Sequence, residues 1–140
     1  KSREEASDEI PAVPSVPVAV TLWLTERKEE AIAILIEDTS FQPGPVEVLR
    51  SFRTKESDLP RMSPEELQPL QLEFINVASE TKAMCRALRV QISKEEADGR
   101  AENAAAWRKI HQGIGRELMK PKYVAILNMV GEAIYKYKLE

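Results

Sequence analysis

The sequence predicts a mainly α-helical protein, with a helical bundle or a long helical hairpin in its C-terminal half. Three observations favour this class. Apolar residues in the segment 69–92 recur at the alternating four- and three-residue spacing of one helix face. A Ser-Pro-Glu-Glu helix start precedes that segment at Ser63, and a second apolar stripe occupies residues 123–137. We expect the N-terminal half to be helical too, with a small β-meander and hence an α+β fold as the alternative.

The chain has 140 residues, which suits one ordinary domain with three parts. Residues 1–18 contain three prolines at three-residue spacing. Because proline fixes φ and lacks an amide donor, we expect an extended or disordered tail there. Residues 19–62 are expected to form a small N-terminal subdomain, and residues 63–140 the helical bundle region.

Residues 18–37 are compatible with two structures. Their apolar residues alternate with period two on both sides of a charged centre, which is the pattern of a β-hairpin. The centre, Thr25 to Glu30, is rich in helix formers and lacks the glycine or Asn-Gly pair of a tight hairpin turn. We therefore favour a helix, ended by Asp38 and Thr39.

A Gln-Pro-Gly-Pro turn is predicted at 42–45. Its last proline suits the first position of a short helix with Val46, Leu49 and Phe52 on one side. Alternating valines in the same segment favour a third strand as the competing structure. Residues 54–62 are interpreted as a polar connector.

The longest predicted helix follows Ser63, which forms a capping box with Glu66. Pro69 is expected to kink its first turns or to restart the helix there. A second capping box at 93–96 either begins a new helix or lies inside a continuous one. The predicted core stripe is Leu70, Phe74, Val77, Thr81, Met84 and Leu88, widened by Ile75, Ala78, Cys85 and Ile92.

Another helix is predicted after Gly99, with Trp107, Ile110, Ile114 and Leu118 on one side. Its glycines, Gly113 and Gly115, each cost a helix interior up to about 1 kcal/mol relative to alanine. A glycine that faces a neighbour also lets two helices approach closely.

The last helix is predicted to open at Pro121, because the residue before a proline avoids the α region. Its core stripe is Tyr123, Leu127, Val130, Ile134 and Tyr137, and further apolar residues are Val124, Ile126, Met129 and Ala133. A helix that is apolar over so much of its circumference needs burial on more than one side, inside a bundle or in an oligomer interface.

Composition indicates a soluble globular protein, with 43% hydrophobic and 31% charged residues. The net charge of −3 argues against wholesale electrostatic binding of nucleic acid. Cys85 is the single cysteine, so no intrachain disulfide forms, and no apolar run reaches the length of a membrane span. We expect a cytoplasmic protein, although the chain begins at Lys1 and a removed targeting segment stays open.

No constellation for catalysis is evident. His111 is the single histidine and has no nucleophile that sequence would pair with it, and Cys85 lies among apolar neighbours. Gly113 and Gly115 lack the third glycine of a dinucleotide fingerprint, and the paired glutamates at helix starts are explained by capping. We expect no enzyme, no cofactor and no metal site.

The leading hypothesis is therefore a non-enzymatic helical protein–protein interaction module: an adaptor, an assembly factor or a subunit of a larger complex. Its partner would be another protein or a second copy, in a homo-oligomer or a hetero-complex with bundle or coiled-coil packing. The alternative is a nucleic-acid-binding protein that uses the basic face from Arg108 to Lys122. The candidate partner-binding residues are Trp107, Arg108, Lys109, His111, Gln112, Arg116, Lys120, Lys122, Leu127, Val130 and Ile134.

Overall fold

The computed structural model describes residues 10–37 and 44–137. These residues form helices and no strand, so the prediction of a mainly α fold is confirmed and the β-meander is wrong for this part of the chain. The elements are α2 (Val16–Leu24), α3 (Lys28–Leu35), η1 (Arg50–Phe52), η2 (Glu56–Arg61), α4 (Pro64–Ala97), α5 (Ala101–Leu118) and α6 (Ala125–Lys136).

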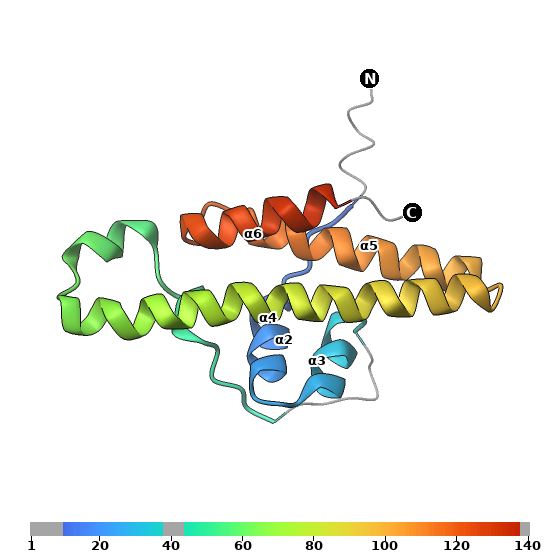
Figure 1. The fold of residues 1–140 in the computed structure, drawn as a ribbon, viewed down its shortest axis with the longest axis horizontal. Helices are drawn as coiled ribbons and strands as arrows, with labels where there is room; N and C mark the ends of the chain where they lie inside the picture. The colour runs from blue at the N-terminus through green and yellow to red at the C-terminus, as the bar shows by residue number, and fades with distance from the viewer. Residues whose placement is uncertain (1–9, 38–43, 138–140) are drawn as a thin grey trace, which may run out of the picture.

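The long helix α4 lies between two layers (Figure 1). α2 packs on one side of it with α3 against α2, while α5 and α6 pack on the other side, with α5 antiparallel to α4 and α6 parallel to it. Buried side chains from both layers and from α4 belong to one hydrophobic cluster. No helix in the described ranges is long and apolar enough to cross a membrane.

α2 begins earlier than the sequence suggested. Val16 is its first residue and is fully buried, so the extended tail predicted for residues 1–18 is wrong at its last three positions. Pro17 is tolerated because an amide in the first helical turn has no intrahelical acceptor. Residues 1–9 lie outside the described residues, and the division into tail, subdomain and bundle stays a prediction.

The helix favoured for residues 18–37 is confirmed, but it is divided into α2 and α3. The division falls at Glu26, whose φ of 67° is left-handed and cannot continue a right-handed helix. Trp23, at the end of α2, donates from Nε1 to Glu80 Oε1 of α4 at 2.9 Å. α3 ends at Leu35, while the expected terminators Asp38 and Thr39 lie outside the described residues.

Residues 44–62 correct two predictions. The helix expected after the 42–45 turn is a single 3₁₀ turn, η1, and the predicted polar connector contains η2. η1 is held on α4 by Glu73, whose Oε1 accepts from the Ser51 amide at 2.7 Å and from the Ser51 hydroxyl at 2.5 Å. The first two residues of the predicted turn, 42 and 43, lie outside the described residues.

α4 starts as predicted. The Glu66 amide donates to Ser63 Oγ at 3.2 Å, and the Ser63 amide donates to Glu66 Oε1 at 3.0 Å, which completes the capping box. The helix then runs without interruption through Pro69 and Ser93, so the restart expected at Pro69 is wrong. Pro69 lies close to the helix start, where the loss of one hydrogen bond is offset by the packing that follows.

The predicted core stripe of α4 is confirmed with one exception. All six stripe residues are buried, as are Cys85 and Ile92, and Ala78 is half-buried. Ile75, expected to widen this face, is instead 59% exposed. α4 ends at a left-handed glycine, Gly99, with φ of 79°, and the Arg100 amide closes the helix end on the Glu95 carbonyl at 2.8 Å.

α6 begins at Ala125, so the prediction that Pro121 opens the last helix is wrong. Its first amide donates to Glu56 Oε1 of η2 at 2.8 Å, a cap supplied from 69 residues away. The predicted close approach of helices is confirmed at Gly115. A Cβ placed there would lie 2.7 Å from the Gly131 carbonyl oxygen of α6. Gly113 makes room for the N-terminal segment, because its Cβ would lie 2.5 Å from the Pro11 carbonyl oxygen.

Candidate functional site

His111 is fully buried beneath α4. Its Nε2 lies 3.0 Å from Arg89 Nη1, and since a guanidinium can only donate, the neutral ring accepts at Nε2. Burial, together with the nearby Arg89 charge, lowers the pKa of His111 to about 4. Among the described residues His111 Nδ1 has no hydrogen-bond partner, and no nucleophile is hydrogen-bonded to the ring. The ring is therefore placed as a structural residue.

Cys85 is equally enclosed, with 1% of its surface exposed. Burial raises the pKa of its thiol to about 12, so the thiol is protonated at neutral pH and is a poor nucleophile. Within residues 10–37 and 44–137, no three His, Cys, Asp or Glu side chains gather as ligands of a metal ion.

Three of the five cations on the predicted basic face from Arg108 to Lys122 pair with two acids. Arg108 forms an ion pair with Glu96 of α4. Lys120 Nζ lies 2.8 Å from Glu117 Oε1, and Lys122 Nζ lies 3.8 Å from Glu117 Oε2. Glu117 is fully buried, which is tolerable because these cations and a hydrogen bond compensate its charge.

That hydrogen bond comes from Tyr123, whose hydroxyl donates to Glu117 Oε2 at 2.5 Å. Burial and the Glu117 carboxylate raise the pKa of Tyr123 well above its usual range. In the sequence Glu117 is the single acid between Arg108 and Lys122. Its central position was not predicted, because the bonds depend on how the α5–α6 turn folds.

The remaining predicted residues of α5 are dispersed. Arg116 Nη1 donates to the Ile10 carbonyl at 3.0 Å, which ties down the N-terminal segment. Trp107 is half-buried against the core and Gln112 is half-buried, whereas Lys109 is exposed. These side chains do not form one cationic surface.

The predicted partner-binding residues of α6 are Leu127, Val130 and Ile134, and all three are buried inside the chain itself. A buried side chain has no surface to offer a partner. α6 instead exposes Met129 by 68% and Ile126 by 36%. The excess apolar surface expected for this helix is therefore present, but Ile126 and Met129 provide it and the predicted partner-binding residues do not.

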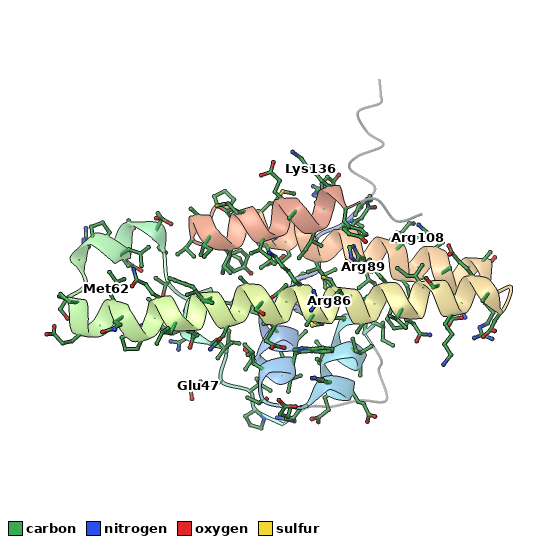
Figure 2. All side chains as sticks on the ribbon, in the orientation of Figure 1. Glu47, Met62, Arg86, Arg89, Arg108 and Lys136 are labelled. Carbon is green, nitrogen blue, oxygen red and sulfur yellow. The ribbon has the colours of Figure 1, made fainter. Side chains whose placement is uncertain are left out.

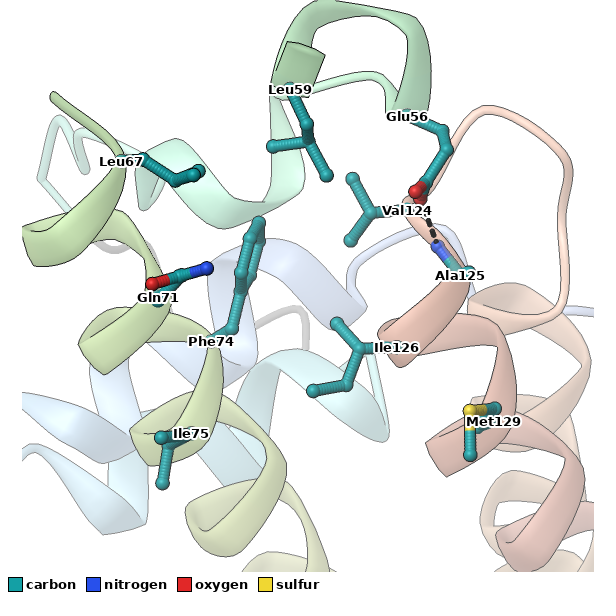
Figure 3. Close-up of a pocket in the computed structure, with 10 residues that line it drawn as sticks. All are labelled: Glu56, Leu59, Leu67, Gln71, Phe74, Ile75, Val124, Ala125, Ile126 and Met129. Atoms are coloured by element: carbon teal, nitrogen blue, oxygen red, sulfur yellow. Dashed lines mark hydrogen bonds between the residues drawn. The ribbon is translucent and has the colours of Figure 1, made fainter. Parts of the chain in front are cut away.

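Ile126 and Met129 border an apolar hollow between α4 and α6 (Figure 3). Its volume is about 640 Å³, and η2 closes one end. The bond from Ala125 to Glu56 holds η2 against the start of α6 and so fixes this end wall. The lining side chains are Glu56, Leu59, Leu67, Gln71, Phe74 and Ile75, with Val124, Ala125, Ile126 and Met129 on the α6 side.

A second, smaller hollow of about 180 Å³ lies between the same two helices. It is lined by Lys82, Cys85, Arg86 and Arg89 of α4 and by Ala133, Ile134 and Tyr137. Lys82 and Arg86 are exposed, and neither forms an ion pair with any residue that the structure describes. This end of the α4–α6 interface is therefore positively charged.

Arg89 is held in place at the basic end. Its guanidinium carbon lies 4.0 Å from the centroid of the Tyr137 ring, and the same ring lies 5.9 Å from the His111 ring. Cation–π stacking and the bond to His111 together orient the guanidinium between α4 and the end of α6 (Figure 2). The role of His111 is thus to position a cation.

The two hollows follow one another along α4 and α6, and we call them together the α4–α6 groove. On α4, Gln71, Lys82 and Arg89 lie on one side of the helix at multiples of three and four residues. From Gln71 to Arg89 the groove extends for about 27 Å at 1.5 Å per residue. The matching stripe is Ile126, Met129 and Ala133 of α6, followed by Tyr137 just after the end of this helix.

Sequence reasoning missed the basic end, although a signal was present. From Thr81 to Lys94 inclusive the sequence has four cationic residues and no acidic one. Comparison with known protein families, curated protein sequences and solved structures finds no match to this chain. Its function must therefore be inferred from its own geometry.

Proposed function

We propose that this chain is a protein-interaction module that binds its partner along the α4–α6 groove. The observation that carries the proposal is the apolar hollow of about 640 Å³, bordered by the exposed side chains of Ile75 and Met129. Contiguous exposed apolar surface between two helices is typical of sites that receive a helix from a partner.

The rigidity of the groove supports the proposal. Each wall is fixed by its own contacts: α4 by its capped start at Ser63, η2 by the bond from Ala125 to Glu56, and α6 by its close packing on Gly115. A preformed groove loses less conformational entropy on binding than a mobile one. No comparable support exists for catalysis, because His111 and Cys85 are buried and uncharged at neutral pH.

The test is a selection of helical peptides on the full chain. A displayed library of 18-residue peptides carries apolar residues at alternating three- and four-residue spacing, with all other positions randomised. Clones selected on the wild-type chain are then measured against Ile75→Glu and against Leu72→Glu. Leu72 and Ile75 form a matched pair, because they are similar in size, both lie on α4 and both are 59% exposed. Only Ile75 lines the groove.

We expect the selected clones to bind the wild-type and Leu72→Glu chains equally and to lose at least tenfold in affinity for Ile75→Glu. Met129→Glu should have the same effect as Ile75→Glu, with Val90→Glu as its control at nearly equal exposure. Circular dichroism establishes that all four variants stay folded. The proposal is wrong if no clone binds, or if the groove variants bind as well as their controls.

A further inference from the structure

The α4–α6 groove has a chemical polarity along its length. Its first half, around Ile75, Ile126 and Met129, is apolar. Its second half presents Lys82, Arg86 and Arg89 on successive turns of α4. The whole chain carries a net charge of −3, so this local concentration of positive charge runs against the balance of the molecule.

Among residues 10–37 and 44–137, no acidic side chain pairs with Lys82, Arg86 or Arg89. Glu80, the nearest acid before Lys82 in the sequence, is bonded to Trp23 in the layer on the other side of α4. On α6, Glu132 pairs with Lys136 at 2.7 Å. Arg89 contacts a neutral imidazole and an aromatic ring, neither of which cancels its charge. An acidic group supplied from outside the chain would meet the three cations of α4 here.

We infer that the partner is an amphipathic helix of about 18 residues whose apolar face fills the hollow at Ile75 and Met129 and whose acidic residues cluster at one end, against Lys82, Arg86 and Arg89. The inference rests on the proposed function and specifies its partner. The length follows from the span of the groove, and the acidic end follows from its charge.

A second copy of the chain fits this surface less well. The exposed apolar residue of α4 that lines the groove, Ile75, lies in the first half of the helix, and the cations of the groove lie in its second half. Antiparallel α4 helices paired over their whole length would therefore place the apolar end of one groove on the basic end of the other. Pairing over the apolar ends alone would leave the cations of both copies uncovered.

The experiment uses a second version of the peptide library. Its apolar positions are fixed, and the outward positions of the first two and the last two turns are varied among Glu, Gln and Lys. Selection is made on the wild-type chain, and each recovered clone is measured by fluorescence anisotropy at low and at high salt. Arg86→Glu is compared with Lys94→Glu, which makes the same change in net charge at an exposed cation outside the hollow.

We expect Glu to be enriched in one terminal block only. Clones enriched in Glu should bind the Arg86→Glu chain at least tenfold more weakly than the wild type, and should bind the Lys94→Glu chain with nearly the wild-type affinity. Added salt should lower their affinity for the wild-type chain. Clones with Gln in both blocks should be insensitive to Arg86→Glu but still sensitive to Met129→Glu.

Three outcomes would overturn the inference. Clones that require the apolar hollow but show no preference for Glu would leave the proposed function standing and reject the acidic partner. Self-association of the wild-type chain in light scattering, abolished by Met129→Glu, would assign the groove to a second copy. Binding of an RNA oligonucleotide that Arg86→Glu removes, with no acidic peptide recovered, would assign the basic end to nucleic acid.

Discussion

Replacing Gly131 by alanine should destabilise this protein, although the same change stabilises most helices. In an exposed helix interior, alanine is favoured over glycine by about 1 kcal/mol. At Gly131 the added Cβ would lie 2.7 Å from the Gly115 carbonyl oxygen and 2.8 Å from Leu118 Cβ. Ordinary contacts of a Cβ begin at 3.4 Å, so α5 and α6 must separate locally by about 3.4 − 2.7 = 0.7 Å.

The magnitude follows from two opposing effects. Overpacking a well-packed site costs about 1–3 kcal/mol, and the upper end applies because the Gly115 oxygen is backbone and cannot rotate away. Subtracting the helical gain of about 1 kcal/mol leaves a net loss of about 2 kcal/mol in the free energy of unfolding. The assay is equilibrium urea unfolding followed by circular dichroism.

Two further variants make the measurement decisive. Gly44→Ala is the control, since nothing lies within 4 Å of its Cβ position, and its stability should change by less than about 0.5 kcal/mol. The double variant of Gly115→Ala with Gly131→Ala should lose less than the sum of the single losses, because helices already forced apart admit the second methyl group. A Gly131→Ala protein as stable as the wild type would refute the close α5–α6 packing.

Three other predictions concern stability and reactivity. Because the folded pKa of His111 is lowered to about 4, the unfolded chain takes up this proton first. The free energy of unfolding of the wild type, relative to that of His111→Gln, should therefore fall by about 2–3 kcal/mol as the pH falls from 6.5 to 4. Urea unfolding at several pH values measures this difference, and a difference that does not change with pH would contradict the prediction. Ser63→Ala should lower the free energy of unfolding by about 1 kcal/mol through loss of the α4 cap, as measured by thermal or urea unfolding. Ser63→Asp should keep most of the stability that the cap contributes, because aspartate also caps helices. The Cys85 thiol should react with an aromatic disulfide reagent only when urea unfolds the chain, and rapid labelling of the native protein would contradict its burial.

The parts of the fold that could be predicted depend on local pattern. The core stripe of α4 and its capping box at Ser63 involve residues within one helix, so spacing and side-chain chemistry decide them. Ile75 shows the limit of the pattern. Periodicity places it beside the stripe, but only the position of α6 determines whether anything covers it.

The parts that could not be predicted depend on distant contacts. α6 starts at Ala125, where Glu56 accepts its first amide, and no local signal marks that position. α2 and α3 separate at Glu26, a residue with no intrinsic preference for a left-handed φ. Likewise, the neutralisation of the cations around Glu117 requires the turn between α5 and α6.

An exposed apolar surface on the last helix was predicted, but its position on that helix was not. The surplus apolar surface of the last helix was expected from its composition, and α6 does expose Ile126 and Met129. Which side of α6 faces outward is determined by its contact with α5, and this contact could not be derived from spacing alone. The cations at positions 82, 86 and 89 were visible in the sequence, but their neighbour across the groove was not.

The same glycine contact explains why the groove stays open. Gly131 lies against Gly115, so α6 cannot rotate without driving a larger side chain into the α5 backbone. With Gly131 fixed inward, the helical repeat directs Met129 outward, and the protein cannot bury this apolar side chain by turning the helix. The α5–α6 packing thus keeps the Met129 side chain at the surface, where the partner helix that we propose would cover it. Gly131→Ala should therefore weaken the binding of groove-selected peptides as well as the fold.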